Sequence, residues 1–526
     1  MTTAAAQARY PLTQGVNPWL VTVSVMLPTF MEVLDTAIAS VALPYIAGSL
    51  SASNSEATWV LTSYLVANAV ILPASNWFAR RWGRKRFLLI CVVLFTVASF
   101  FCGAAPSLGV ILLARIMQGA GGGALQPLSQ SILLESFPIE KRSMSMAAYG
   151  LGIVVAPVIG PTLGGWLTDT FSWRNAFYIN IPVGILAFVL ITRFVHDPPY
   201  IKNAKVGAFD NIGFGLLMVW TGALQIVLDK GQEDDWFAAN WIVIATVVSA
   251  AALILFVVHE LHTPDPVVHL RVFKNRTYAA GVFLMTMLGF VLYGSLLLLP
   301  VFLQTMLGYS ALDAGIAMAP RGLGSFLMMP LVGTVLGRFD PRKVLAVGLV
   351  GASWTLYLLS NINLTAGYWD IFWPQFIQGA ALAMLFVPLT TATMDPIPRE
   401  EMGNATSMFN LMRNLGGGFG IAAATTFLFR RQQFHTLRLG EHVSMLNSQT
   451  RSFMAGTQSA MMTHGGDPVA AASQSYLALW GTVQRQSAML AFVDTFRAMA
   501  LVFLLVLPFL LIMKRPKHHR TPGPMH

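Results

Sequence analysis

Two acidic residues lie inside the first long apolar segment of the chain, residues 19–42. Glu32 and Asp35 are three residues apart, so a helix places both on one face. An aspartate at the centre of a membrane helix costs about 2.5–3.5 kcal/mol on insertion scales, so this face is expected to look into a protein interior or a wet cavity. Such acids are candidates for proton exchange. The alternative is a structural role, in which they only pair with basic residues to hold helices together.

A basic partner for Asp35 is expected in the fourth apolar segment. Asp35 lies nine residues before Pro44, and Arg115 lies eight residues after Ser107. At a rise of 1.5 Å per residue, these offsets place the two charges about 13 and about 12 Å below the same membrane surface. Burial disfavours the charged form of a carboxyl group and a neighbouring arginine favours it. A group balanced in this way takes and releases a proton as its exposure changes; a static salt bridge is the alternative.

The composition places both segments in a membrane protein with many spans. Of the 526 residues, 55% are hydrophobic and only 11% are charged, whereas soluble domains carry about 25% charged residues. Residues 1–18 are polar, so no cleavable signal peptide is expected. Hydropathy predicts fourteen spans, at residues 19–42, 57–79, 87–105, 109–134, 144–168, 174–195, 210–229, 239–261, 277–304, 311–336, 343–361, 370–394, 403–429 and 491–513.

The formal charge of +10 is explained better by topology than by a nucleic-acid partner. The basic residues are scattered through short loops, and the densest group, residues 80–86, follows the second span. An even number of spans puts both termini on one side, and the positive-inside rule makes that side the cytoplasm. The short loops on the other side carry only Arg174 and Lys230. Cys91 and Cys102 lie on one span about 16 Å apart by rise, too far for a disulfide, so they are interpreted as packing residues.

An internal repeat divides the chain. Gln118-Gly119-Ala120 recurs 260 residues later as Gln378-Gly379-Ala380, and the loop 137–140 recurs as 397–400. This maps spans one to six onto spans nine to fourteen in the same orientation, an arrangement known as a parallel repeat. The expected organisation is an N-terminus at 1–18, a six-helix bundle at 19–195, two inserted helices at 210–261, a second six-helix bundle at 277–513 that includes an outer loop at 430–490, and a basic tail at 514–526.

Several motifs follow one another in order along the chain. They are residues 34–44 in the first span, 77–85 in the loop after the second, 115–119 in the fourth, 157–165 in the fifth, and 373–379 and 388–391 in the twelfth. Together they resemble the major facilitator superfamily and, within it, the fourteen-span drug:proton antiporters of the EmrB and QacA type. The loop motif departs from the family pattern at Asn76, where Gly is usual, and at Arg80, where Asp is usual.

The resemblance implies an all-α major facilitator fold, with two six-helix bundles and two inserted helices. Proton coupling is expected at Glu32, Asp35 and Arg115, from their positions inside the first and fourth spans. Two simpler interpretations stay open: the loop charges only fix orientation, and the Gly and Pro residues of the fifth span only allow close packing or a bend. The residues expected to take part in conformational change are Arg81, Gly83, Arg84, Lys85, Pro157, Gly160, Pro161, Gly164 and Gly165.

Other residues near the span centres are harder to interpret. The sequence names no partner for Arg321 or Arg413, and Asp494 is expected to pair with Arg497 one turn along its own helix. A second group could line a drug cavity, with ordinary apolar packing as the alternative. Its members are Phe30, Met31, Tyr64, Phe290, Tyr293, Gln375, Phe376 and Phe409.

Enzymatic chemistry is not expected. Neither a phosphate-binding G-x-x-x-x-G-K-[ST] loop nor a Ser/His/Asp, HExxH or CxxC pattern is present. His518 and His519 lie in the basic tail, where no metal site is expected. No cofactor is therefore expected, and a proton gradient is the expected source of energy.

The sequence and the resemblance together predict a proton-driven antiporter of the bacterial inner membrane, which exports hydrophobic drugs or toxic organic compounds and so confers antibiotic resistance. By resemblance, the outer segment 430–490 meets a periplasmic membrane-fusion adaptor of the EmrA type that leads to an outer-membrane channel of the TolC type. Residues 468–490 are expected to be helical. Two alternatives remain: a proton-linked carrier for one dedicated metabolite, and a membrane sensor that carries nothing.

Overall fold

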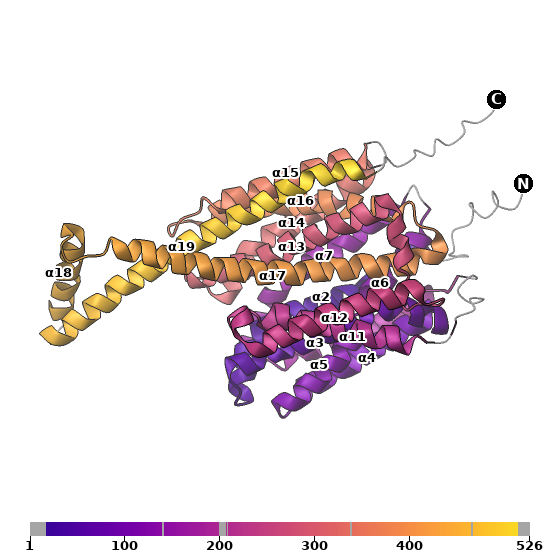
Figure 1. Cartoon of the computed structure of the whole chain (residues 1–526), viewed down its shortest axis with the longest axis horizontal. Helices are drawn as coiled ribbons and strands as arrows, with labels where there is room; N and C mark the ends of the chain where they lie inside the picture. Colours follow the sequence, from indigo (N-terminus) through magenta and orange to yellow (C-terminus); the bar gives the residue numbers. More distant parts are fainter. Residues whose placement is uncertain are drawn as a thin grey trace, which may run out of the picture.

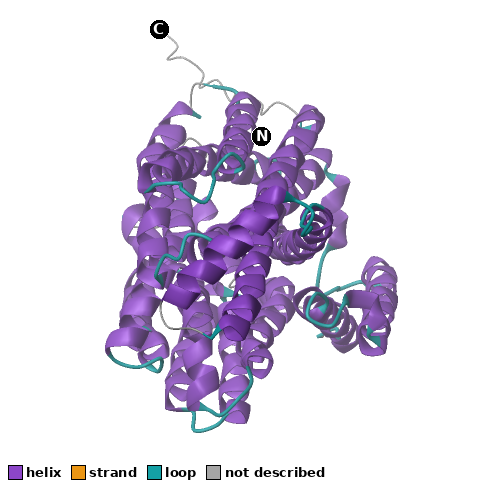
Figure 2. Ribbon diagram, turned by 90° about the vertical axis from the view of Figure 1, so that its left-hand side faces the viewer, coloured by secondary structure: helices purple, strands orange, loops and turns teal. Residues whose placement is uncertain are grey.

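The computed structural model describes residues 17–138, 141–198, 207, 209–336, 339–463 and 467–513. The polar N-terminus and the basic tail lie outside these residues, as do Lys202 and Lys205, two basic residues after the sixth predicted span. Throughout the described part the chain is helical, and no strand occurs in it (Figure 2). The all-α fold class predicted from the sequence is confirmed.

The first bundle begins at Pro18, where Asn17 caps the first helix by accepting a hydrogen bond from the backbone N–H of Trp19. Two short helices, α5 and α6, together form one span of residues 108–136. The bundle consists of α2 (Pro18–Ser49), α3 (Asn54–Trp82), α4 (Arg84–Ala104), α5 (Leu108–Gly122), α6 (Leu125–Ser136), α7 (Arg142–Thr170), α8 (Asn175–Tyr178) and α9 (Asn180–Phe194).

Two inserted helices separate this bundle from the second one. They are α11 (Asn211–Lys230) and α12 (Asn240–His262), joined through the short η2 (Trp236–Ala238) and followed by η3 (Leu270–Lys274). The second bundle consists of α13 (Arg276–Thr305), α14 (Ala311–Val335), α15 (Pro341–Leu359), α16 (Tyr368–Met394), η4 (Arg399–Glu401), α17 (Met402–Glu441), α18 (Ser448–Thr463), α19 (Pro468–Val506) and η5 (Leu507–Ile512).

The two bundles repeat the same helix contacts. Gly119 of α5 packs on the backbone carbonyl of Tyr64 in α3, and Gly379 of α16 packs on the carbonyl of Arg321 in α14. A side chain at either glycine would overlap that carbonyl, which is why small residues recur where membrane helices approach closely. Tyr64 and Arg321 therefore occupy corresponding positions in the two halves, in keeping with the repeat inferred from the sequence.

Thirteen helices within the described residues are long and apolar enough to cross a membrane. Their outer faces expose large apolar side chains such as Ile244 and Ile254 of α12, which are 63% and 64% exposed, as expected for surfaces that contact lipid. The remaining predicted span lies within α17, which carries polar residues such as Asn410 and Arg413 in its buried part. These residues lower its hydropathy below that of the other spans. The chain is a multi-pass membrane protein.

Buried polar contacts join the bundles in the half of the molecule that contains the start of α2 and the end of η5 (Figure 1). There the Ser75 and Ser407 hydroxyl oxygens lie 2.9 Å apart. The Asn410 amide donates to Gln130 Oε1 at 2.6 Å, and the Thr406 hydroxyl donates to the carbonyl of Pro127 at 3.2 Å. All of these groups are buried. The passage between the bundles is therefore closed at this end.

The outer segment 430–490, predicted as a loop, is largely helical. α17 and α19 continue past the other spans as a hairpin, with α18 across its tip (Figure 1). The helix expected over 468–490 is confirmed, because α19 begins at Pro468 and Asp467 caps it by accepting from two backbone N–H groups at 3.1 Å. We name residues 430–490 the outer hairpin.

The base of the outer hairpin corrects one expectation. Asp494 of α19 does not depend on Arg497 of its own helix. It contacts Arg431 and His435 of α17 at 2.5 and 2.7 Å. Spacing along one helix did not reveal this pairing, because the partners lie on the neighbouring helix of the hairpin. The ion pairs join α17 to α19 where the hairpin leaves the bundle.

Candidate functional site

Asp35 is at the centre of a buried polar network in the first bundle. Its Oδ2 lies 2.6 Å from Nη1 of Arg115, and both side chains are fully buried. Its Oδ1 accepts hydrogen bonds from the amides of Gln118 at 2.9 Å and Asn180 at 2.6 Å. The contact between Asp35 and Arg115, predicted from their depth, is present. The Asp35 carboxylate of α2 is thus held by side chains from α5 and α9.

Arg115 is fixed by further contacts. Its Nε donates to the carbonyl of Val60 at 2.9 Å, and its Nη1 also donates to Gln118 Oε1 at 2.6 Å. Its guanidinium carbon lies 4.3 Å from the centre of the Tyr64 ring, a favourable arrangement of a cation over an aromatic face. Only one nitrogen of Arg115 meets Asp35. Because hydrogen bonds to a charged carboxylate are stronger than those to a neutral acid, protonation of Asp35 would weaken its bonds to Arg115, Gln118 and Asn180 together.

Glu32 lies close to this network but is held more loosely. The Asn68 amide donates to Glu32 Oε1 at 3.0 Å, whereas Oε2 has no hydrogen-bond partner among the described residues. Gly122 leaves room beside it: a Cβ there would lie 2.7 Å from the Tyr64 hydroxyl and 3.4 Å from Cγ of Glu32. Both acids therefore face the interior of the bundle, as their spacing predicted.

A connection between the bundles runs through Gln126. Arg413 of α17 donates a hydrogen bond to Gln126 Oε1, and Gln126 also interacts with Glu32. The Tyr149 hydroxyl donates to the backbone carbonyl of Gln126 at 3.0 Å. Gln126 thus stands between a buried acid of the first bundle and a buried arginine of the second.

The loop between α3 and α4 contacts two acids. Gly83 has a φ of +89°, a conformation that glycine adopts readily, and lies against Asp197. Asp197 Oδ1 accepts from the backbone N–H of Lys85 at 2.9 Å, and Arg84 pairs with Glu135 at 2.7 Å with both side chains buried. These acids meet the loop although Arg80 replaces the Asp usual in the motif.

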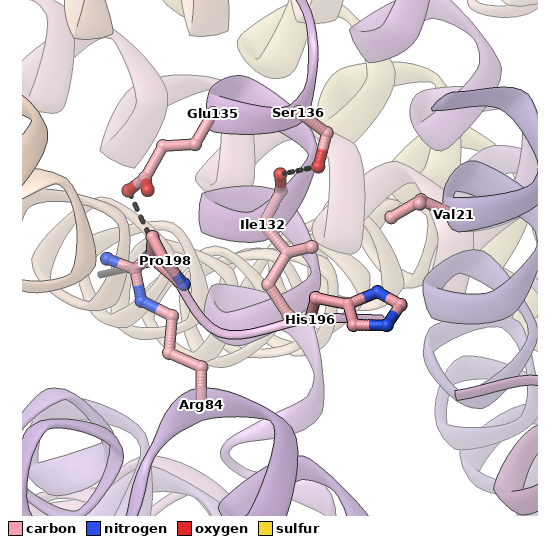
Figure 3. Close-up of a pocket in the computed structure, with 7 residues that line it drawn as sticks. All are labelled: Val21, Arg84, Ile132, Glu135, Ser136, His196 and Pro198. Atoms are coloured by element: carbon pink, nitrogen blue, oxygen red, sulfur yellow. Dashed lines mark hydrogen bonds and ion pairs between the residues drawn. The ribbon is translucent and has the colours of Figure 1, made fainter. Parts of the chain in front are cut away.

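A small cavity of about 20 Å³, room for a water molecule, lies beside this ion pair (Figure 3). Arg81, from the same motif, is exposed. The role of the loop in conformational change stays a prediction.

The glycines of α7 bring that helix against α2, which carries both acids. Gly160 packs on Ala37, and a Cβ at Gly164 would lie 3.1 Å from the Cα of Ile38. Pro157 and Pro161 lie inside α7, and Gly165 is buried beside them. This close approach is what small residues in membrane helices allow. The gating role predicted for these residues stays a prediction.

The residues proposed for a drug cavity are divided by the structure. Met31, Tyr64, Gln375 and Phe409 are fully buried, and Tyr64 packs on Arg115 while Gln375 donates to Gln378 at 3.2 Å. The half-buried members are Phe30, Phe290, Tyr293 and Phe376. Their role in binding substrate stays a prediction.

Three residues of the site were not singled out from the sequence. Gln118 belonged to a quoted motif without a role, and Gln126 and Asn180 were not named. Asn180 reaches Asp35 because the short α8 turns the chain just before α9 starts. Polar residues inside apolar spans were the available signal, since such groups are expensive unless they are paired. Within the described residues, no group of three or more His, Cys, Asp or Glu side chains is placed to hold a metal ion.

Comparison with known proteins identifies the family. The family model described as Major Facilitator Superfamily matches residues 25–421. The chain belongs to the major facilitator superfamily. Among solved structures, this transporter resembles the human organic anion transporter MFSD10, with a TM-score of 0.60 and 12% identity over 94% of this chain and 99% of that one. It also resembles the proton:xylose symporter XylE, with a TM-score of 0.56 and 16% identity over 90% of this chain and 94% of that one.

Curated relatives place the transporter within the EmrB-type drug-transporter family. It is 39% identical to the multidrug export protein EmrB of Haemophilus influenzae over 85% of this chain and 87% of that protein. It is 36% identical to the fatty acid resistance protein FarB of Neisseria gonorrhoeae over 98% of this chain and 99% of that one. The EmrB protein of Escherichia coli is 36% identical over 87% of this chain and 89% of that protein. The predicted family is confirmed.

Proposed function

We propose that this transporter is a proton-driven antiporter that exports hydrophobic drugs or toxic organic compounds across the bacterial inner membrane. The observation that carries the proposal is the fully buried Asp35, held by Arg115, Gln118 and Asn180. An ionisable residue at this depth marks a proton path more often than a structural contact. The export function named for the EmrB relatives supports the substrate class. The energy comes from the proton gradient, without a cofactor.

The expected topology follows from the charges. The basic loop between α3 and α4, with Arg80 and Arg86, lies at the end where α2 begins (Figure 1). The loop between α11 and α12 at the other end carries Glu233, Asp234 and Asp235. The positive-inside rule then places both termini in the cytoplasm. In this orientation the structure is closed toward the cytoplasm.

The proton cycle uses the two acids in different ways. A proton that enters from outside neutralises Asp35 and weakens its bonds to α5 and α9. Neutralising Glu32 weakens the link through Gln126 to Arg413, which helps to hold the cytoplasmic side closed. Opening on that side releases the proton and admits substrate. Each elementary charge that crosses 100 mV supplies about 2.3 kcal/mol for this cycle.

The outer hairpin is the proposed docking site for a periplasmic adaptor of the EmrA type, which leads to an outer-membrane channel of the TolC type. The hairpin extends beyond the spans and exposes apolar side chains outside the membrane: Leu437 is 71%, Leu446 91%, Leu477 68% and Trp480 54% exposed. Large apolar patches that are exposed to water mark interaction sites. The hairpin also lies on the side that faces the periplasm in the proposed topology.

Transport by the purified protein tests the proposed function. Reconstituted in liposomes with an imposed pH gradient, it should move ethidium and at least two chemically unrelated organic compounds, and movement should stop when the gradient is collapsed. Transport of one compound alone would favour a dedicated metabolite carrier. Absence of any gradient-dependent movement would favour a membrane sensor.

A further inference from the structure

The second bundle contains a buried arginine that the proton cycle does not use. Arg321 lies on α14 and is 1% exposed. Its Nη2 donates to Gln378 Oε1 at 2.5 Å, and Gln378 also accepts from the amide of Gln375 at 3.2 Å. Nε and Nη1 of Arg321 and Oε1 of Gln375 have no partner within the described residues. A buried guanidinium thus meets one neutral acceptor only.

Within the described residues, no carboxylate forms an ion pair with Arg321. α13 contains no acidic residue, and the acidic residues of α14 and α16 lie in the first turns of those helices, at Asp313 and Asp370. A buried charge without a counter-ion is strongly unfavourable, by several kcal/mol in order of magnitude. This cost suggests that Arg321 is neutralised by an anion that binds and leaves during the transport cycle.

The corresponding position in the first bundle contains the acid that Arg321 lacks among the described residues. Tyr64 corresponds to Arg321, and Arg115, 260 residues before Gln375, corresponds to that glutamine. In the first bundle the arginine lies on α5 and its carboxylate, Asp35, is supplied by α2. In the second bundle the arginine lies on α14, and among the described residues neither α13 nor the buried parts of α14 and α16 supply an acid. The two halves share the same helix packing, but within the described residues only the first bundle pairs its arginine with an acid.

We propose that Arg321, with Gln375 and Gln378, is a binding site for the carboxylate of an amphiphilic organic acid carried by this transporter. The planar guanidinium has free donors at Nε and Nη1, and either can give a carboxylate a charge-assisted hydrogen bond. When the Gln375 side chain turns away from Gln378, its NH₂ group exchanges the hydrogen bond to Gln378 for one to the anion. The half-buried Phe290, Tyr293 and Phe376 lie on the neighbouring α13 and α16, beside which an apolar body would pack.

This inference rests on the proposed transport function and names one substrate class for it. The second bundle would select for negative charge, whereas the first bundle would handle the proton. Uncharged compounds would gain nothing from Arg321. The selection is therefore measurable by comparing two ligands that differ only in the acid group.

The test uses the full chain in lipid nanodiscs at pH 7.5 and two tritiated probes, 2-naphthoate and the uncharged 2-naphthamide. Arg321→Gln should weaken naphthoate binding by about tenfold or more, which corresponds to one lost charge-assisted contact, and naphthamide binding by less than about twofold. Arg321→Lys should lie between, because it keeps the charge and loses the fork. Leu323→Ala, at an exposed position of α14, is the control and should change neither.

A second variant separates recognition from folding. Gln375→Glu places an internal carboxylate beside Arg321, so the protein should melt at the same temperature or higher and yet lose naphthoate binding. Equal loss of both naphthalene probes in Arg321→Gln, or wild-type affinity for naphthoate in Gln375→Glu, would overturn the anion site.

Different results would contradict the anion site and the proposed transport function. If the wild-type protein transports ethidium on a gradient but binds naphthoate no better than naphthamide, the anion site is wrong and the antiporter stands. If naphthoate binds through Arg321 but nothing is transported, the site stands and the proposed transport function is wrong.

Discussion

The hydroxyl oxygens of Ser75 and Ser407 lie 2.9 Å apart, one on α3 of the first bundle and the other on α17 of the second. Both side chains are buried, so the contact excludes water from the closed end of the passage. Alternating access in such folds is largely a rocking of one bundle against the other. This pair must therefore separate in each transport cycle if the closed end opens.

The first prediction is that a cross-link between these positions stops transport. In the double variant with Ser75→Cys and Ser407→Cys, a disulfide should form, because the side chains already meet at a distance close to that required. Oxidation should abolish proton-driven efflux from liposomes, and a reducing agent should restore it. Each single variant serves as a control, since the native Cys91 and Cys102 are buried. Unchanged transport by fully cross-linked protein would show that this end does not open.

The second prediction concerns Asp35. Asp35→Asn should abolish proton-driven export while the protein remains folded and inserted, because the amide keeps a similar shape but cannot carry the proton. The measurement is efflux in everted membrane vesicles with and without a pH gradient. Asp169→Asn, at the outer end of α7 where the Tyr45 hydroxyl contacts Asp169, is a matched control. Export that remains gradient-dependent in Asp35→Asn would move the coupling role to Glu32.

The third prediction concerns the partner of that acid. Arg115→Ala should impair transport more than Arg115→Lys, because lysine retains the charge that faces Asp35 and loses only the planar donors that also reach Val60 and Gln118. The readout is the dependence of the transport rate on pH. If neither variant shifts that profile, Arg115 holds the helices together and does not set the proton affinity of the site.

The sequence was most informative about features that depend only on distance along a helix axis. Span positions, the repeat and the depths of Asp35 and Arg115 all depend on distance along the helix axis, and a rise of 1.5 Å per residue gives that distance directly. The same reasoning does not give the direction in which a side chain points around its helix relative to distant neighbours. Asn180 was missed for this reason, although it lies within 2.6 Å of Asp35.

The spacing of residues along each helix could not predict the contacts between the two bundles. Arg413 and Gln126 are separated by 287 residues and come from different halves of the repeat. Nothing in the spacing of either helix predicts which face meets the other bundle. The structure of the outer hairpin was also difficult to predict. Residues 430–490 are too polar for a span, and α17 packs against α19, a contact that hydropathy does not reveal.

The last prediction tests the outer hairpin. Replacing residues 440–484 by a flexible linker keeps Arg431, His435 and Asp494, so the base of the hairpin is preserved. A linker of about fifteen residues spans the gap at roughly 5–6 Å × √n. Because the spans satisfy their own backbone hydrogen bonds, proton-coupled transport in liposomes should persist. Drug resistance of whole Gram-negative cells should be lost, since export there must also cross the outer membrane.

Two results would count against docking on this hairpin. Full resistance with the shortened hairpin would mean that an adaptor is absent or binds elsewhere on the transporter. Loss of transport in liposomes would instead make the segment part of the transport cycle. A milder variant distinguishes these cases: Leu477→Ser with Trp480→Ser removes exposed apolar side chains, 68% and 54% exposed, without shortening either helix. Since neither residue is buried in the bundle, this double variant should transport normally in liposomes and fail only in cells, where the exposed apolar face of α19 would no longer hold its partner.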